Sequence, residues 1–425
     1  MIAHALTPLL AFASLGAWIG LVAFRNGFWA DATLLEQEVL VRAKAAQRHD
    51  REKNWPRVVA IVPARNEAET IAPVVKAHLA SDYPGDFSML LVDDQSDDGT
   101  AEIAQKAIES AAEGAPDSAK ESPNKTAQKS SGRSDFLRVI KGSTPPEGWS
   151  GKVWALQQGY DAALRMRPPA DYVLLTDADI LHAPGSLRLL VSTAEYRGLA
   201  LLSLMARLDA RGFWGGLLVP AFIFFFQKLY PFPAANEPAN AIAAAAGGCV
   251  LLRAKDLEAI GGFGAISDAL IDDCALAAAM KAGGDRRCEV YVSDDTVVSL
   301  RDNRRLDSIW TMVARTAFTQ LDYSWRALAV AIAGLALVYL VPPLALLVGL
   351  FSGDTAVLLA GATATLLMAR AYRPTAQLYR VDGWRLFLLP VAASLYMGMT
   401  IDSALRHARG RGGAWKGRTF QKRAH

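Results

Sequence analysis

The stretch Tyr172-Val173-Leu174-Leu175-Thr176-Asp177-Ala178-Asp179 joins a short apolar run to two carboxylates. On both sides of it, between residues 57 and 292, similar apolar runs alternate with amphipathic stretches. This alternation is typical of βαβ units and of a mainly parallel sheet. The candidate strands are residues 58–62, 88–92, 136–140, 172–175 and 199–204. The sequence therefore predicts an α/β domain.

Polar and acidic residues directly follow three of these strands. Pro63-Ala64-Arg65-Asn66-Glu67 follows the first, Asp93-Asp94 follows the second, and Asp177-Ala178-Asp179 follows the fourth. In open α/β sheets, ligands bind outside the carboxyl ends of the strands. We therefore expect the three groups to meet at one crevice, which is the main functional signal in the sequence.

The residue types around this crevice favour phosphate and metal chemistry. Asp177-x-Asp179 suits Mg²⁺ or Mn²⁺, which take carboxylate oxygens and leave positions for phosphate oxygens. Such pairs also occur by chance on solvated loops, so the position at a strand end is what favours a metal site. Lys152 precedes an amphipathic helix over residues 153–166 and faces either a phosphate or solvent. Asp272-Asp273 opens a helical run, either as acids favoured by the helix dipole or as a general base.

Several further residues have two interpretations or little to favour a role. Asp94 could bind a base or ribose, while Asp97-Asp98-Gly99-Thr100 is typical of a turn that opens the next helix. Arg315, in an amphipathic helix, is either a snorkelling arginine or one that clamps a phosphate. Gly247-Gly248 precedes an apolar strand where a ligand can approach the backbone closely. His182 is notable only for its closeness to Asp179.

Composition excludes some classes of protein. The 425 residues carry 45 Lys and Arg against 42 Asp and Glu, a net charge of +3 that gives no reason to expect a nucleic-acid partner. Hydrophobic residues make up 52% of the chain, more than in an ordinary soluble domain. Cys249, Cys274 and Cys288 are widely spaced and suggest neither a disulfide scaffold nor a zinc site.

Part of this apolar excess predicts membrane segments. Residues 6–24 form an almost uncharged run that is long enough to cross a bilayer, and we expect an uncleaved N-terminal anchor rather than a signal peptide. A second apolar block comprises residues 327–351, 356–368 and 386–401, of which only the first is comfortably long. The sequence thus predicts a multi-pass protein of the inner (plasma) membrane.

Loop charges indicate the orientation of these segments. Basic residues cluster at 25–53, which places the body of the chain in the cytoplasm. The tail, residues 403–425, is also basic and favours the cytoplasm, whereas four full spans would place it outside. Either a short segment such as 386–401 is re-entrant, or the first segment does not span.

Residues 212–233 carry Lys228 as their only charge and are long enough for a span. A crossing here would separate Asp177 and Asp179 from Asp272 and Asp273. If these acids form one site, the segment must dip into the near leaflet and return, which its glycines and prolines would permit, and an interfacial element beside the site implies a lipid acceptor. The alternative is a buried core hairpin.

Residues 109–135 are rich in Ser, Ala, Lys and Pro and hold hardly any large apolar residue. Such a segment cannot bury enough surface to offset its ordering entropy. We expect a disordered surface insertion with no catalytic part.

Taken together, these motifs resemble a family 2 glycosyltransferase with the GT-A fold, over residues 57–321. More narrowly, the N-terminal anchor, residues 268–273, residues 312–318 and Trp415-Lys416-Gly417-Arg418 resemble the hopene-associated glycosyltransferase HpnB group. The resemblance covers the following ordered motifs: residues 61–67, Val92-Asp93-Asp94-x-Ser96-x-Asp98-Gly99-Thr100, Gly151-Lys152-x-x-Ala155-Leu156, Asp177-x-Asp179, Gly261-Gly262-Phe263 and Asp272-Asp273-x-x-Leu276.

The resemblance implies a role for each site residue. Asp177 and Asp179 hold Mg²⁺ or Mn²⁺ on a nucleotide-diphosphate sugar, and Asp273 is the base of an inverting single displacement. The residues implied in nucleotide-sugar binding are Pro63, Asn66, Glu67, Asp94, Lys152, Asp177 and Arg315. The chain departs from processive members of the family, because Arg315 is followed by Thr316 and lacks the tryptophan of the Gln/Arg-x-x-Arg-Trp motif.

We therefore expect a hexosyltransferase that moves one sugar to a lipid hydroxyl, with a hopanoid as the suggested acceptor. The alternatives are a processive polysaccharide synthase, a polyprenyl-phosphate glycosyltransferase and, from another class, a non-catalytic membrane scaffold that retains the fold. The expected organisation is an anchor at 1–25, a GT-A domain at 50–322, a transmembrane region at 327–402 and a basic cytoplasmic tail at 403–425.

Overall fold

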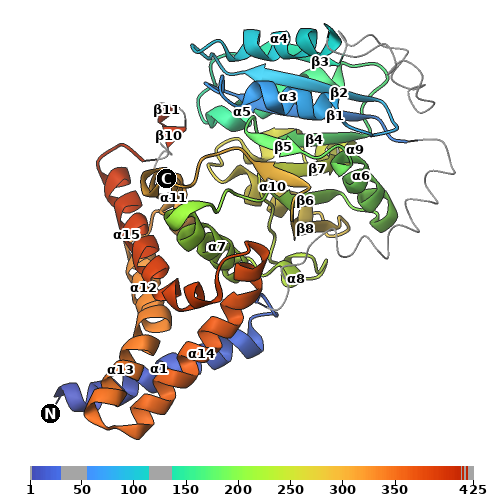
Figure 1. Cartoon of the computed structure of the whole chain (residues 1–425). Helices are drawn as coiled ribbons and strands as arrows, with labels where there is room; N and C mark the ends of the chain where they lie inside the picture. The colour runs from blue at the N-terminus through green and yellow to red at the C-terminus, as the bar shows by residue number, and fades with distance from the viewer. Residues whose placement is uncertain (1, 30–54, 114–135, 413, 416–417, 420–425) are drawn as a thin grey trace. The chain divides into compact units, whose positions relative to one another are not determined.

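The computed structural model of the chain contains two compact units (Figure 1). The structure describes residues 2–29, 55–113, 136–412, 414–415 and 418–419. The expected insertion therefore falls mostly outside the described residues, as do five of the six basic residues at 25–53 and three of the seven in the tail. One unit comprises Thr33–Leu208, Ala235–Arg301 and Trp415–His425, and the other Met1–Ala32, Asp209–Ala234 and Asp302–Ala414.

The first unit is built on a seven-stranded sheet with the order β3-β2-β1-β4-β7-β6-β8. Neighbouring strands are parallel except where β7 pairs antiparallel with β4 and with β6. The mainly parallel α/β sheet predicted from the sequence is thus confirmed. The strands are β1 (Val58–Ala64), β2 (Phe87–Asp93), β3 (Leu137–Lys141), β4 (Tyr172–Thr176), β6 (Leu201–Met205), β7 (Cys249–Arg253) and β8 (Cys288–Val292).

Helices cover both faces of the sheet because successive strand residues point to opposite sides. On β1, Ala60 and Val62 pack with α3, α4 and α6, while Ile61 packs with α5, α9 and α10. A second, two-stranded sheet pairs β5 (Ile180–His182), which follows β4 closely in the sequence, with the distant β9 (Val297–Ser299). The helices are α3 (Ile71–Leu79), α4 (Thr100–Glu113), α5 (Gly151–Leu164), α6 (Ser186–Arg197), α9 (Ala254–Ala259), η3 (Gly262–Ile266) and α10 (Asp272–Lys281).

The second unit is helical. Side chains of α1 tie it to the π-helical turn η5: Trp18 Nε1 donates to the carbonyl of Val338 at 2.6 Å, and Ser14 Oγ donates to that of Leu337 at 2.7 Å. Its elements are α1 (Ile2–Phe24), α7 (Gly212–Leu229), α11 (Leu306–Thr316), η4 (Thr319–Leu321), α12 (Trp325–Leu335), η5 (Ala336–Leu340), α13 (Val341–Ser352), α14 (Thr355–Leu378), η6 (Gly383–Leu388) and α15 (Leu389–Ala408). The short α8 (Phe232–Ala235) follows α7, and β10 (Ala414–Trp415) pairs with β11 (Arg418–Thr419).

Five helical segments of the described chain are long and apolar enough to cross a membrane: Leu6–Phe24, Gly212–Leu229, Trp325–Ser352, Thr355–Leu378 and Gly383–Ala408. The expectation that the last two segments are short is wrong, because they run to 24 and 26 residues. The arginines from Arg370 onward had suggested that this segment ends near residue 368, yet α14 continues through them. The Arg370 guanidinium lies 5.0 Å from the centre of the Trp29 ring. Outward-facing Leu9, Val330 and Leu366 are 65%, 72% and 63% exposed, which is typical of surfaces that meet lipid.

Helix α7 is continuous through Gly215, Gly216 and Pro220, so these residues do not turn the chain back as expected. The Tyr396 hydroxyl of α15 donates to the Leu218 carbonyl at 2.9 Å and holds α7 within the helical unit. The core-hairpin alternative is therefore also wrong.

Sheet connectivity nevertheless excludes a full crossing by α7. The helix lies between β6 and β7 in the chain, and these two strands pair directly. A single crossing would place β6 and β7 on opposite sides of the membrane. The described residues between α7 and β7 contain no second helix long enough to bring the chain back.

Cysteine labelling tests this topology, because the three native cysteines are buried and free. We expect Lys106→Cys, before α7, and Ala239→Cys, after it, to react with a membrane-impermeant maleimide from the same side. Both positions are exposed. Labelling after detergent permeabilisation is the control, and reaction from opposite sides would show that α7 crosses.

Candidate functional site

Lys152 joins two of the predicted acidic groups. It lies in the first turn of α5, and its Nζ is 3.0 Å from Asp177 Oδ1, just after β4, and 3.2 Å from Asp272 Oδ2, at the start of α10. Burial alone would lower the pKa of Lys152, but Asp177, Asp272 and Asp273 together hold it well above its ordinary value. The side chain is only 21% exposed, so the interpretation as a solvated first-turn lysine is wrong.

Asp273 is held by two backbone N–H groups. Its Oδ2 accepts from Gly247 at 2.8 Å and its Oδ1 from Cys274 at 2.7 Å. Burial, with Asp272 beside it, raises the pKa of Asp273 to about 6, against the opposing effects of Lys152 and the two N–H groups. A carboxylate so placed is deprotonated at neutral pH and can still accept a proton.

Gly247 permits this close packing because it has no side chain. A Cβ at this position would lie 3.3 Å from Lys152 Nζ and 3.4 Å from Asp273 Oδ2. Strand β7 runs antiparallel to β4. Gly247, just before β7, therefore lies at the same sheet edge as Asp177, just after β4. Asp177 therefore meets Asp272 and Asp273 at this edge, as expected if these acids form one site.

Asp179 lies deeper than Asp177. Its side chain is 8% exposed, and its Oδ2 is 3.1 Å from Arg301 Nη2. Burial raises the pKa of Asp179; Arg301 opposes the rise, whereas Asp177 and Glu67 add to it. Arg301, two residues after β9, thus neutralises one acid of the pair, as Lys152 neutralises the other.

The cavity at these acids is nearly filled in this structure. Its volume is about 10 Å³, which is room for about one water molecule and far below the size of a sugar site. Its lining includes Pro63, Lys152, Asp177, Gly247 and Asp273. A ligand of that size can enter only if side chains such as Lys152 move.

The loops after β1 and β2 interlock through polar groups. The Asn66 N–H donates to Ser96 Oγ at 3.0 Å, and Asn66 Oδ1 accepts from the Asp97 N–H at 3.0 Å. The Glu67 N–H donates to Thr100 Oγ1 at 2.9 Å. Asp98 Oδ1 accepts from the Thr100 N–H at 3.1 Å, so the interpretation of this stretch as a helix-opening turn is confirmed.

Asp94 and Arg315 are two further residues that the resemblance implies in nucleotide binding. The Asp94 side chain is 1% exposed, and its Oδ2 lies 3.8 Å from Arg65 Nη1. Arg315 is exposed in the last turn of α11, within the helical unit. Their roles in nucleotide binding stay predictions.

His182 belongs to a buried network rather than to the crevice. Its Nε2 is 2.9 Å from Thr176 Oγ1, its Nδ1 is 3.3 Å from Ser186 Oγ, and Thr176 Oγ1 also donates to the Gly248 carbonyl at 3.0 Å. Burial holds the pKa of His182 well below its usual range, with a further lowering by His78, so the ring is neutral. This network fixes the residues that precede Asp177 and follow Gly247.

Two ion pairs of the site were not predicted from the sequence. Arg301 stands in a charged run with no motif to mark it, and only the β5–β9 pairing brings it to Asp179. Asp272 was recognised as an acid at a helix start, but its partner Lys152 lies 120 positions earlier and gives no local signal.

The donor set fits a divalent cation that arrives with a ligand. No group of three or more His, Cys, Asp or Glu side chains in the described part of the chain could hold an ion. Mg²⁺ is commonly bound through one or two carboxylates plus substrate phosphates and water. Asp177 and Asp179 would be the carboxylates of such a site, and this assignment stays a prediction.

The network around His182 predicts a stability difference. Thr176→Val removes the hydroxyl that bonds His182 and Gly248, and we expect a loss of about 1–3 kcal/mol in the free energy of unfolding, measured by denaturant titration. Thr193→Val is the matched control, because Thr193 is also buried and its hydroxyl has no hydrogen-bond partner. Equal effects of the two substitutions would contradict the network.

Comparisons with known proteins bear on this site. No curated protein matches the chain. Solved structures that match include a mannosyltransferase from Pyrobaculum calidifontis in complex with GDP-Man and Mn²⁺, with 18% identity, a TM-score of 0.46, and coverage of 95% of this chain and 99% of that chain. Another is glucosyl-3-phosphoglycerate synthase from M. tuberculosis, with 17% identity, a TM-score of 0.39, and coverage of 65% and 84% respectively.

The sequence profile of glycosyl transferase family 21 matches residues 137–423, which is more than half of the chain. This range includes Lys152, both acids of the Asp177-x-Asp179 pair and Asp273. The motif resemblance had indicated glycosyltransferase family 2, whereas the profile that matches is that of family 21. The chain belongs to glycosyl transferase family 21.

Proposed function

We propose that this glycosyltransferase is a membrane-bound, inverting enzyme with a GT-A domain, and that it transfers one sugar from a nucleotide-diphosphate sugar to a lipid hydroxyl. The observation that carries the proposal is the cluster of Lys152, Asp177, Asp272 and Asp273 at the carboxyl edge of the sheet. A hopanoid is the acceptor suggested by the motif resemblance. The α/β unit would lie on the cytoplasmic face of the inner membrane, where nucleotide sugars are available.

Asp273 is the proposed base. As the acceptor hydroxyl attacks the anomeric carbon, a new carbon–oxygen bond forms, the bond to the diphosphate breaks, and the hydroxyl proton passes to Asp273. The N–H groups of Gly247 and Cys274 keep its carboxylate oriented during this step. Attack from the face opposite the leaving group inverts the configuration and needs no covalent intermediate.

Charge builds on the departing diphosphate, and the cationic side of the site would stabilise it. Lys152 would turn from the carboxylates to a phosphate oxygen, with Arg315 assisting. A Mg²⁺ or Mn²⁺ ion held by Asp177 and Asp179 would neutralise further charge on the diphosphate. Pro63, Asn66, Glu67 and Asp94, at the ends of β1 and β2, would position the nucleotide.

The lipid acceptor is supported by the composition of the helical unit. Five apolar segments accompany the α/β unit in one chain, and α7 is apolar yet excluded from a full crossing. An apolar helix that cannot cross is suited to lie in the bilayer interface, where a lipid hydroxyl is found.

Asp273→Asn tests the base assignment. We expect kcat to fall by a factor of about 10²–10⁴ while the KM for the donor changes little, measured with purified enzyme in lipid. Asp268→Asn, an exposed carboxyl in the same stretch, is the control. Activity close to wild type in Asp273→Asn would exclude Asp273 as the base and revive the scaffold alternative.

The pKa of Asp273 also predicts a pH profile. A base must be deprotonated to act, so kcat/KM should be constant above about pH 6 and fall about tenfold per pH unit below it. Rates measured from pH 4.5 to 8 check this. A profile with no acidic limb near pH 6 would contradict the assignment.

Lys152 should compete with a metal ion for Asp177. We expect Lys152→Gln to bind Mn²⁺ about tenfold more tightly than wild type when no nucleotide is present, because the ammonium no longer neutralises Asp177. Electron paramagnetic resonance titration of free Mn²⁺ measures this without any turnover. Lys106→Gln, an exposed lysine on α4, is the control, and unchanged or weaker Mn²⁺ binding in Lys152→Gln would contradict the competition.

A further inference from the structure

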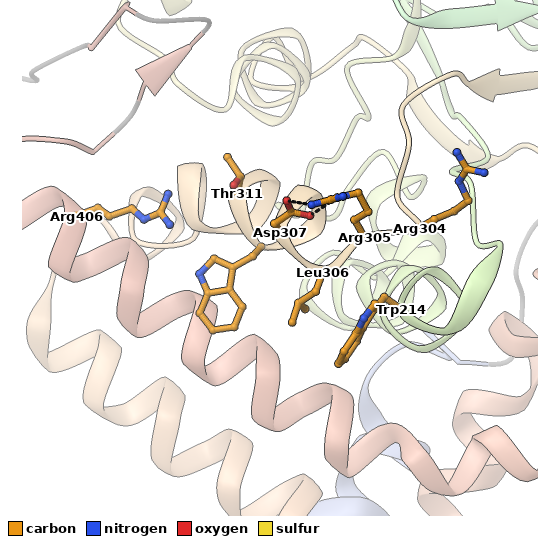
Figure 2. Close-up of a pocket in the computed structure, with 8 residues that line it drawn as sticks. Trp214, Arg304, Arg305, Leu306, Asp307, Thr311 and Arg406 are labelled. Carbon is orange, nitrogen blue, oxygen red and sulfur yellow. Dashed lines mark hydrogen bonds and ion pairs between the residues drawn. The ribbon is translucent and has the colours of Figure 1, made fainter.

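A second cavity, of about 640 Å³, lies within the helical unit (Figure 2). Its lining includes two indoles, Trp214 and Trp310, and three guanidinium groups, of Arg304, Arg305 and Arg406, with Asp307 as the only acid. The volume falls within the range of small-ligand sites. None of these residues takes part in the proposed sugar transfer.

The cavity lies at the ends of apolar helices. Trp214 is in the first turn of α7, and Arg406 is in the last turn of α15. Both helices belong to segments apolar enough for a membrane. Tryptophan and arginine at the ends of such helices are typical of the level of the lipid headgroups. The cavity therefore opens where a membrane would present phosphate groups.

Helix α11 forms the wall between these ends. Its apolar face buries Ile309, Val313 and Ala314, while Trp310 stays half-buried. Trp310 Nε1 donates to Asp402 Oδ2 of α15 at 2.7 Å, which fixes the indole as a flat wall. An apolar wall of this kind suits the glycerol and upper acyl part of a lipid, beside its charged headgroup.

The arginines are accessible although each has an acidic partner. Figure 2 shows Arg305 paired with Asp307. Arg305 Nη2 lies 2.9 Å from Asp307 Oδ2, and both side chains are more than 60% exposed. Arg406 Nη2 lies 2.7 Å from Asp402 Oδ2, and Asp402 is shared with Trp310. The exposed Arg305–Asp307 pair contributes little stability, and Arg406 is 39% exposed. Either guanidinium can therefore turn to a phosphate, which it binds in bidentate fashion.

We propose that this cavity binds the phosphate headgroup of an anionic membrane phospholipid through Arg305 and Arg406, with Trp214 and Trp310 against the lipid. The lining carries three positive groups and one negative group, while Asp302 and Asp402, outside the lining, pair with Arg304 and Arg406. A phosphodiester that has no compensating cation would take the place of these carboxylates on the guanidinium groups. The site would hold α7, α11 and α15 at a fixed depth in the membrane. The proposal does not depend on the transfer reaction.

The test uses the full-length protein in nanodiscs of phosphatidylcholine alone or with phosphatidylglycerol, which differ in headgroup charge. We expect phosphatidylglycerol to raise the thermal midpoint by about 3 °C or more in wild type, and native mass spectrometry to show retained phosphatidylglycerol. The double variant Arg305→Gln/Arg406→Gln should lose both effects. Arg326→Gln, an exposed arginine outside the cavity, is the control and should behave like wild type.

Three results would overturn the proposal: no preference for phosphatidylglycerol in wild type, an equal response in the double variant, or equal loss of the lipid in Arg326→Gln. Displacement of the retained lipid by millimolar inorganic phosphate would also overturn it, because the cavity would then be a phosphate site. If the double variant does not fold, the single variants are compared by the retained-lipid measurement alone, and wild-type levels in both would contradict the site.

Discussion

The bridge from Lys152 to Asp177 and Asp272 is the interaction on which the rest of the site depends. It ties the start of α5 to the end of β4 and the start of α10, three points widely separated in the chain. Two carboxylates this close would repel each other without a cation between them. The lysine therefore keeps the acids together and leaves Asp273, one residue further on, free to be oriented by Gly247 and Cys274.

The same bridge explains why the cavity is small. A lysine that neutralises the acids also fills the space that a diphosphate would need. The site can then open only if Asp177 and Lys152 find other partners. A ligand that brings a divalent cation and phosphate oxygens supplies both, the cation for Asp177 and a phosphate oxygen for Lys152. In the proposed function, donor binding is thus an exchange of ion pairs within a preformed sheet edge, without new folding.

Much of this could be predicted from the sequence. Asn66, Asp94 and Asp177 come shortly after apolar runs, so the sequence places them at the ends of strands. Because the connections in βαβ units follow simple rules, these strand ends were expected at one edge of the sheet. Arg301 could not be predicted, since it reaches Asp179 only through the β5–β9 pairing, which three-residue strands do not reveal. The Thr176–His182 network was missed for a similar reason, because hydrogen bonds between buried side chains leave no periodic pattern. In the helical unit, hydropathy located the segments but placed the C-terminal end of α14 too early.

The central claim is that Asp273 and its neighbours transfer one sugar to a lipid. The most direct measurement is mass spectrometry of lipid extracts from cells that carry the wild-type gene, the Asp273→Asn gene or no gene. We expect one lipid whose mass exceeds that of an unmodified lipid by a single sugar residue, present only with the wild-type gene. A polymeric product, or the same glycolipid with Asp273→Asn, would contradict the account.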